Sequence, residues 1–165
     1  MAHNVHVWIT GTIQGEIQGD STVTSMGREG SIEAFKLEHT VEIPIGASGS
    51  AEGERSHGPI KITKRIDRSS PLLHSALYTN EELDVTIKFY RPNPAGDGTT
   101  EHYYTIGLRR ARICSIKTIN PDTINESTAS APAMDEVAFV FGEITWTYES
   151  AGIVCVDEWR VERGA

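Results

Sequence analysis

The chain has 165 residues, a length typical of one domain. Its formal net charge is −8 at pH 7, and 38% of its residues are hydrophobic. The negative charge argues against general binding to nucleic acid or to anionic membranes, because both need a surplus of positive charge. Its apolar stretches are all shorter than the ~18 residues that a membrane-spanning helix needs. We therefore expect no nucleic-acid partner and no membrane insertion.

The start of the sequence, MAHNVHVWITG, has no basic segment followed by an apolar run. This pattern predicts a chain without a cleaved secretion signal that is made in the cytoplasm. Cys114 and Cys155 form no metal-ligand pattern. In a cytoplasmic chain we expect both thiols to be reduced and to behave as small buried hydrophobic residues in strands.

Alternation of apolar and polar residues predicts strands in most of the chain. The first is marked by Val5, Val7 and Ile9. The run of residues 35–45 alternates over eleven positions and places His39 on its inward side, which we interpret as a core histidine. Residues 83–90 repeat this alternation, and residues 152–161 predict a last strand.

Two predicted strands change the side of their apolar residues part way along. Residues 102–119 begin with Tyr104, Ile106 and Leu108 and then shift to Ala111 and Ile113. Residues 136–148 change in the same way, with a glycine, residue 142, at the change. Such a change predicts a bulge or a bend, and glycine is typical of a sharp barrel corner.

Segments rich in glycine, serine and proline predict four loops, at residues 15–30, 46–58, 92–101 and 120–133. One short helix follows residue 68, with Ser69 or Ser70 as its N-cap and Pro71 at its first position. It ends near Thr79 and Asn80. Many strands with one helix predict a β-barrel or a β-sandwich.

Catalytic and metal-binding patterns are missing from the sequence. The six histidines share no ligand spacing, and neither a G-x-S-x-G motif nor a phosphate-binding glycine loop occurs. Tyr103 and Tyr104 beside Arg109 and Arg110 could stack on single-stranded nucleic acid, but the net charge disfavours that interpretation. We therefore expect no catalytic residues, no cofactor and no metal.

A basic segment stands out in this acidic chain: Lys61, Lys64, Arg65 and Arg68 fall within eight positions. On a strand, Lys61 and Arg65 lie on one side, while Lys64 and Arg68 point the other way. One pair meets solvent, and the other meets solvent, a carboxylate or another subunit. A local basic strip on an acidic chain is self-complementary, which favours contacts between like subunits.

Short motifs along almost the whole chain resemble the Hcp family, the tube protein of bacterial type VI secretion, especially its enterobacterial-type branch. The matching pieces are residues 7–9, 17–21, 28–33, His39, 43–44, Arg55, His57, Pro59, 63–64, 66–67, 69–71, 89–91, 101–105, Leu108, 136–137, 144–148, Asp157 and Trp159. Their order and spacing carry the resemblance, and the loops at 46–56 and 120–133 depart from it.

The resemblance implies one Hcp-like domain over residues 1–165, mainly β, with a β-barrel of two packed antiparallel sheets and one short flanking α-helix. It further implies a homohexamer whose rings stack into a tube. The implied partners are a contractile sheath, a spike protein, a baseplate and effector proteins carried in the lumen. Such a protein assembles in the cytoplasm and is secreted through the apparatus, and ending at Ala165 it would carry no fused effector domain.

The resemblance also gives the basic segment and the long loop before it a role in assembly. The loop at 46–58 is expected to be ordered by the next subunit along the tube, with Arg55 and His57 as anchors, because its glycines leave it too flexible to hold a shape alone. The candidate assembly residues are therefore Arg55, His57, Lys61, Lys64, Arg65 and Arg68. Two alternatives stay open: a monomeric β-barrel that binds a ligand in an apolar cavity, and a β-sandwich enzyme with a polar cleft.

Overall fold

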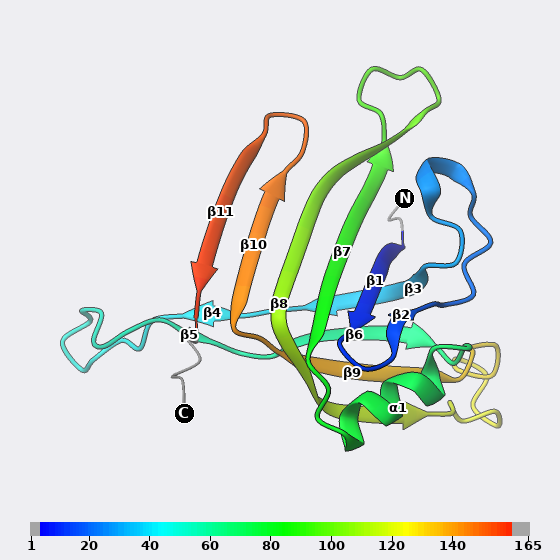
Figure 1. Cartoon of the computed structure of the whole chain (residues 1–165), viewed down its shortest axis with the longest axis horizontal. Coiled ribbons are helices and arrows are strands. Elements are labelled where there is room, and N and C mark those ends of the chain that lie inside the picture. Colours follow the sequence, from blue (N-terminus) through cyan, green and yellow to red (C-terminus); the bar gives the residue numbers. More distant parts are fainter. Residues whose placement is uncertain (1–3, 160–165) are drawn as a thin grey trace.

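The computed structural model describes residues 4–159 (Figure 1). It contains eleven strands, one α-helix and one 3-10 turn within those residues. In chain order they are β1 (Val5–Gly11), β2 (Gly15–Ile17), η1 (Ser25–Gly27), β3 (Ile32–Glu38), β4 (Val41–Glu42), β5 (Ser56–His57), β6 (Ile60–Arg65), α1 (Ser70–Tyr78), β7 (Leu83–Pro92), β8 (Thr100–Ile119), β9 (Met134–Val140), β10 (Glu143–Tyr148) and β11 (Ile153–Glu158).

Six antiparallel strands close into a barrel. Their order is β8, β7, β1, β3, β6 and β9, and β9 pairs back with β8. Figure 1 shows two layers: an upright sheet with β11, β10, β8 and β7, and a lower layer with β3, β6 and β9. The mainly β fold of two packed antiparallel sheets with one short helix is thus confirmed.

Strand β8 joins the two layers because it is 20 residues long and changes partner midway. Residues 104–109 pair with β10, and residues 112–119 pair with β9. Between these halves Arg110 has a φ of 50°, a left-handed backbone that non-glycine residues seldom adopt. The predicted change of side within this strand is confirmed, and its cause is this bend.

The second predicted corner, at Gly142, lies against the same bend. The Gly142 amide donates a hydrogen bond to the Arg109 carbonyl at 3.1 Å. A Cβ atom added to Gly142 would lie 2.6 Å from Arg110 Nε and 3.1 Å from Arg110 Cβ. Only glycine lets the chain pass so close to the bent strand, so β9 and β10 can pair with successive halves of β8.

Apolar side chains fill the barrel interior. The fully buried ones, at 0 or 1% exposure, include Val7, Ile9, Ile32, Ile60, Ile62, Val85, Ile87, Leu108, Val137 and Phe139. Each contributes roughly 1.5–3 kcal/mol by leaving water. Helix α1 lies beside the barrel and buries Leu73 and Ala76 against this core, whereas Leu72 is 39% exposed.

The N-cap of α1 is Ser69, one of the two serines predicted for it, and Pro71 is the second residue of the helix rather than the first. Ser69 occupies the cap position, but its hydroxyl makes no capping hydrogen bond to the helix. Instead, the Asp67 carboxylate accepts hydrogen bonds from the Ser69 amide, at 2.9 Å, and from the Ser69 hydroxyl. The first turn is therefore held by an aspartate two residues earlier in the chain.

Three further predictions need correction. The alternating run 35–45 is not one strand: β3 ends at Glu38, and Val41, Ile43 and Ile45 are 44 to 75% exposed. A bulge between Ala34 and Lys36 shifts the register, so the apolar row leaves the core. Both cysteines lie in strands but are exposed rather than buried. The last strand ends at Glu158, and predicted strand residues 160 and 161 lie outside the described part.

The corner at Gly142 generates a test with a matched control. We expect Gly142→Ala to destabilise the fold by about 1–3 kcal/mol, because the new methyl group overlaps Arg110. Gly107→Ala, in β8 itself, meets only Thr145 Cβ at 3.9 Å and should change stability by less than about 0.5 kcal/mol. Urea unfolding followed by circular dichroism measures both, and equal stability of the two variants would contradict the corner's role.

Candidate assembly surfaces

Residues 39–58, named here the arm, leave the barrel after β3 and return to it before β6. Figure 1 shows the arm projecting to the left of the barrel. Strands β4 and β5 pair within it, and Ile45 forms a bridge with Ala51. Near the tip, the Glu52 amide donates to the Pro44 carbonyl at 2.7 Å. The arm thus has internal hydrogen bonds, and the expectation that it holds no shape by itself is wrong.

Arg55 and His57 attach the arm to β11 of the same chain. The Arg55 guanidinium makes two hydrogen bonds to the Asp157 carboxylate, at 2.7 Å from Nε and 2.6 Å from a terminal nitrogen. His57 Nε2 lies 2.8 Å from the same carboxylate. Hydrogen bonds from Arg55, and then from His57, lower the pKa of Asp157 to about 2. Asp157 is therefore ionised at any physiological pH and clamps the return strand of the arm.

Aromatic rings enclose His57, whose side chain is 1% exposed. Its ring contacts Phe141, Trp146 and Trp159 at centroid distances between 5.1 and 6.2 Å. On its other side lies His39, with Nε2 at 3.3 Å from His57 Nδ1. Burial, and then the charge of His57, lower the pKa of His39. His39 is thus a partly buried histidine at the base of the arm and not a residue of the barrel interior.

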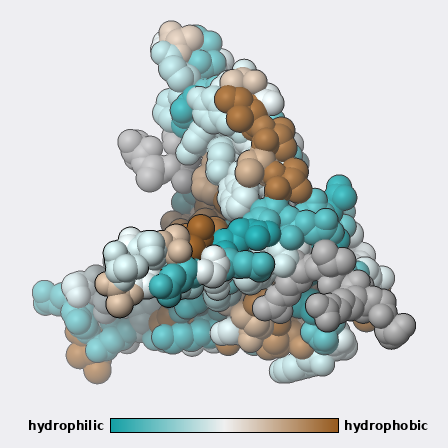
Figure 2. Space-filling view, turned by 90° about the vertical axis from the view of Figure 1, so that its left-hand side faces the viewer, coloured by the Kyte–Doolittle hydropathy of each residue, from teal (hydrophilic) through white to brown (hydrophobic). Residues whose placement is uncertain are grey.

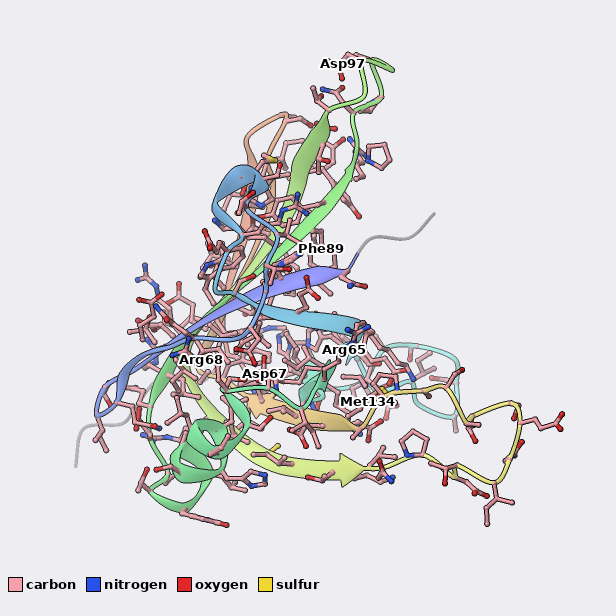
Figure 3. All side chains as sticks on the ribbon, turned by 90° about the vertical axis from the view of Figure 1, so that its right-hand side faces the viewer. Arg65, Asp67, Arg68, Phe89, Asp97 and Met134 are labelled. Atoms are coloured by element: carbon pink, nitrogen blue, oxygen red, sulfur yellow. The ribbon has the colours of Figure 1, made fainter. Side chains whose placement is uncertain are left out.

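The basic segment separates as its alternation predicts for Lys61, Lys64 and Arg65, but Arg68 lies beyond the end of β6 and is exposed rather than on the side of Lys64. Lys61 and Arg65 are exposed on the outer face of β6, and Arg65 lies over the Phe35 ring at 4.9 Å. Arg68 is exposed in the turn before α1, where its amide donates to Asp20. Figure 3 shows Arg65, Asp67 and Arg68 following one another along the segment that leads from β6 into α1. Lys61, Arg65 and Arg68, named here the basic strip, are all exposed, so a neighbouring molecule can reach them.

Lys64 is the exception, because its side chain is completely buried. Its ammonium lies 3.0 Å from Asp67 and 3.7 Å from Asp135, and donates to the Arg65 carbonyl and the Ser70 hydroxyl at 2.9 and 3.0 Å. A residue with no accessible surface cannot contact a neighbouring subunit, so the assembly role predicted for Lys64 needs correction. The sequence left open whether one side of the strand meets solvent, a carboxylate or another subunit. Lys64 contacts carboxylates.

The buried Lys64 and Ser70 are close enough to suggest a nucleophile and its base. Lys64 Nζ, however, donates to the Ser70 hydroxyl instead of accepting its proton, and it also contacts two carboxylates. The Ser70 hydroxyl also accepts the Asp67 amide at 3.1 Å and holds the turn before α1. This cluster is therefore a structural support for the helix.

Strand β11 presents a second surface. It pairs with β10 alone in the described chain, and Ile153, Val154 and Val156 are 55 to 65% exposed. Figure 2 shows a hydrophobic band on the upper part of this side of the molecule. An unpaired, apolar strand edge is a template for pairing with another chain. The sequence predicted the strand but not its edge position, which depends on which neighbours β10 acquires.

Within residues 4–159, no group of three histidine, cysteine or acidic side chains is arranged to bind a metal ion. None of the helices formed by these residues combines the length and apolar character needed to cross a bilayer. One open hollow on the surface, of about 340 Å³, is lined by residues of β7, β8 and β10: Asp84, Val85, Thr86, Thr105, Gly107, Leu108, Arg109, Thr145 and Thr147. A filled barrel with a projecting arm and a free apolar edge defines an assembling structural subunit.

Comparisons with known proteins agree with this class. A family model described as "Type VI secretion system effector, Hcp" matches residues 7–148. The chain is 38% identical to the "Major exported protein" of Pseudomonas aeruginosa, over 97% of each chain. Its fold is similar to a crystal structure of an Hcp protein, with a TM-score of 0.86 and 31% identity over 97% of this chain and 99% of the other.

A variant of Hcp1 from Escherichia coli EAEC 042 is also similar, with a TM-score of 0.83 and 29% identity over 96% of this chain and 99% of that one. The chain belongs to the Hcp family. It is a secreted structural subunit of the type VI secretion tube and not an enzyme. The family predicted from the sequence motifs is thus confirmed.

The Lys64 cluster generates a stability prediction. We expect Lys64→Ala to destabilise the protein by about 3–5 kcal/mol, because it leaves Asp67 and Asp135 charged and poorly accessible without their cation. Lys61→Ala, on the exposed face of the same strand, should cost less than about 0.5 kcal/mol. Urea unfolding of the two variants measures the difference, and similar midpoints would show that the buried pair contributes nothing.

Proposed function

We propose that six copies of this chain close into a ring and that the rings stack into a tube. The observation that carries the proposal is the pair of different free edges on the upright sheet. Among residues 4–159, β11 has β10 as its one neighbour, and at the other end of the sheet the β7 residues beyond Lys88 pair with β8 alone. Two unlike edges on one subunit suit a heterologous contact, which generates rings when the rotation closes.

The arm and the basic strip provide the contacts between neighbours and between rings. The apolar side chains of Val41, Ile43 and Ile45 lie exposed along the arm and gain from burial against another subunit. Lys61, Arg65 and Arg68 face the acidic surface of the next copy, since the chain carries a net charge of −8. Arg55 and His57 hold the arm in the direction from which it reaches its neighbour.

In the cell, residues 1–165 act as one Hcp-like domain in the type VI apparatus. The tube assembles in the cytoplasm, inside a contractile sheath and on a baseplate. It is exported with the spike protein, and effector proteins travel in its lumen. The family membership, together with the exported relative, supports this sequence of events. A ligand-binding barrel is disfavoured because apolar side chains fill the interior.

Native mass spectrometry at micromolar concentration tests the ring directly. We expect a six-subunit particle, and Val154→Lys should convert it to smaller species by placing a charge on the β11 edge. Ile124→Lys is the matched control, since Ile124 is 91% exposed in the loop after β8 and the substitution should leave the ring intact. A wild-type protein found only as monomer or dimer would refute the proposal.

Deletion of residues 47–54 tests the arm. These residues form its tip and include one half of the Ile45–Ala51 bridge, while Arg55 and His57 remain attached to Asp157. We expect thermal unfolding of the barrel to be nearly unchanged, because the tip makes no contribution to the core. Ring stacking and secretion into the medium should be impaired. Normal secretion in a strain with a working sheath would show that the tip is only a surface insertion.

A further inference from the structure

The base of the arm is closed by two histidines that face each other. His39 follows β3, where the arm leaves the barrel, and His57 lies in β5, where it returns. Their ring planes are within 7° of parallel, and His39 Nε2 lies 3.3 Å from His57 Nδ1. The contact therefore joins the two ends of the arm through side chains, beside the backbone pairing of Val41 with His57 and the hydrogen bond from the Gly58 amide to the Thr40 carbonyl.

The hydrogen-bond chain fixes the protons of the neutral pair. Asp157 is ionised and can only accept, so His57 Nε2–H donates to it. A neutral His57 then carries a lone pair on Nδ1, and His39 Nε2–H donates to that nitrogen. Every nitrogen at the contact has its partner in this arrangement.

Adding protons changes this balance in two steps. One added proton can be accommodated, with His57 donating to both Asp157 and His39 while the remaining His39 proton moves to its outer nitrogen. A second added proton cannot be accommodated in the closed arm, because the N–H groups of His39 and His57 would then point at each other across 3.3 Å. The charged groups beside the pair are Asp157 on β11 and Arg55 on the arm, which already bind each other, and Glu38 and Lys61, which line a surface hollow together with His39. The remaining neighbours are the rings of Phe141, Trp146 and Trp159, which carry no charge.

We propose that the His39–His57 contact is an acid-sensitive hinge that holds the arm closed with at most one shared proton and opens it when both rings are charged. The hinge itself requires only the single chain. Its consequence rests on the proposed function: an open arm no longer presents Val41, Ile43 and Ile45 in a fixed direction, so rings stack at neutral pH and separate in acid.

The direction of the pH effect follows from proton uptake. Burial and the neighbouring His57 lower the pKa of His39 in the closed arm below its ordinary value. The open arm therefore binds more protons than the closed arm. Closure is fully favoured above the ordinary histidine pKa of about 6.5 and is lost progressively as the pH falls from that value toward the lowered one.

Hydrogen exchange of the arm amides, expressed as protection relative to the free peptide at each pH, tests the hinge. Between about pH 6.5 and about pH 5 we expect protection of residues 41–57 to fall by up to about tenfold per pH unit, because opening takes up one proton. Protection of β1 and β6 should stay constant. In a Trp8→Phe background, the fluorescence of Trp146 and Trp159 beside His57 should change with the same midpoint.

His39→Gln is the decisive variant, because the glutamine amide can donate to His57 Nδ1 but does not titrate. Its arm protection should be independent of pH, whereas the control His74→Gln, on α1, should keep the wild-type profile. Wild-type protection that is constant down to about pH 5 would overturn the proposal. The same wild-type pH dependence in His39→Gln would also overturn it.

Sedimentation of the same samples separates the hinge from the assembly. Rings and stacks that shrink with the midpoint of the exchange profile, in wild type but not in His39→Gln, support the full proposal. An arm that opens while stacking stays unchanged supports the hinge and refutes its link to assembly. If the protein sediments as a monomer at every pH, the ring proposal fails, and the exchange profile still decides for or against the hinge.

Discussion

The continuity of β8 is the constraint on which the rest of this structure depends. One strand of 20 residues belongs to two different layers, and it can do so only by bending at Arg110, whose backbone is left-handed. Beside this bend only a glycine fits at position 142. The close approach of Gly142 to Arg110 lets β9 and β10 pair with opposite halves of β8. Closure of the barrel by β9 and extension of the upright sheet by β10 and β11 are consequences of this one corner.

The ion pairs around Lys64 and those around Asp157 have different physical roles. Lys64 is inaccessible, so its contacts with Asp67 and Asp135 tie β6, the start of α1 and β9 together, at the cost of removing three charges from water. Arg55 is 41% exposed, and its contact with Asp157 contributes direction more than stability, since solvent screens it. The bidentate geometry and the enclosed His57 nevertheless give the arm one orientation relative to β11.

A free strand edge and exposed rows of apolar side chains favour assembly with further copies of the chain. A stable monomer protects its strand edges and covers its valines and isoleucines. In the described part of this chain, β11 is paired on one side only, and two rows of apolar side chains are exposed, on β11 and on the arm. Both features are liabilities for an isolated molecule and are resolved by contacts with further copies, as expected for a subunit of the type VI secretion tube.

Local patterns in the sequence by themselves determined most of the strands, the single helix, the long loops and the corner at Gly142, because alternation, helix signals and glycine act over a few residues. The motifs along the chain also determined its family. Only the tertiary structure decided that Lys64 faces inward, that Asp67 binds the N-cap residue of α1, and that the row from Val41 to Ile45 leaves the core after a bulge. It also brought His57 to Asp157, which lies 100 positions away. Burial and charge pairing depend on neighbours from distant strands, and sequence spacing carries no information about which strands become neighbours.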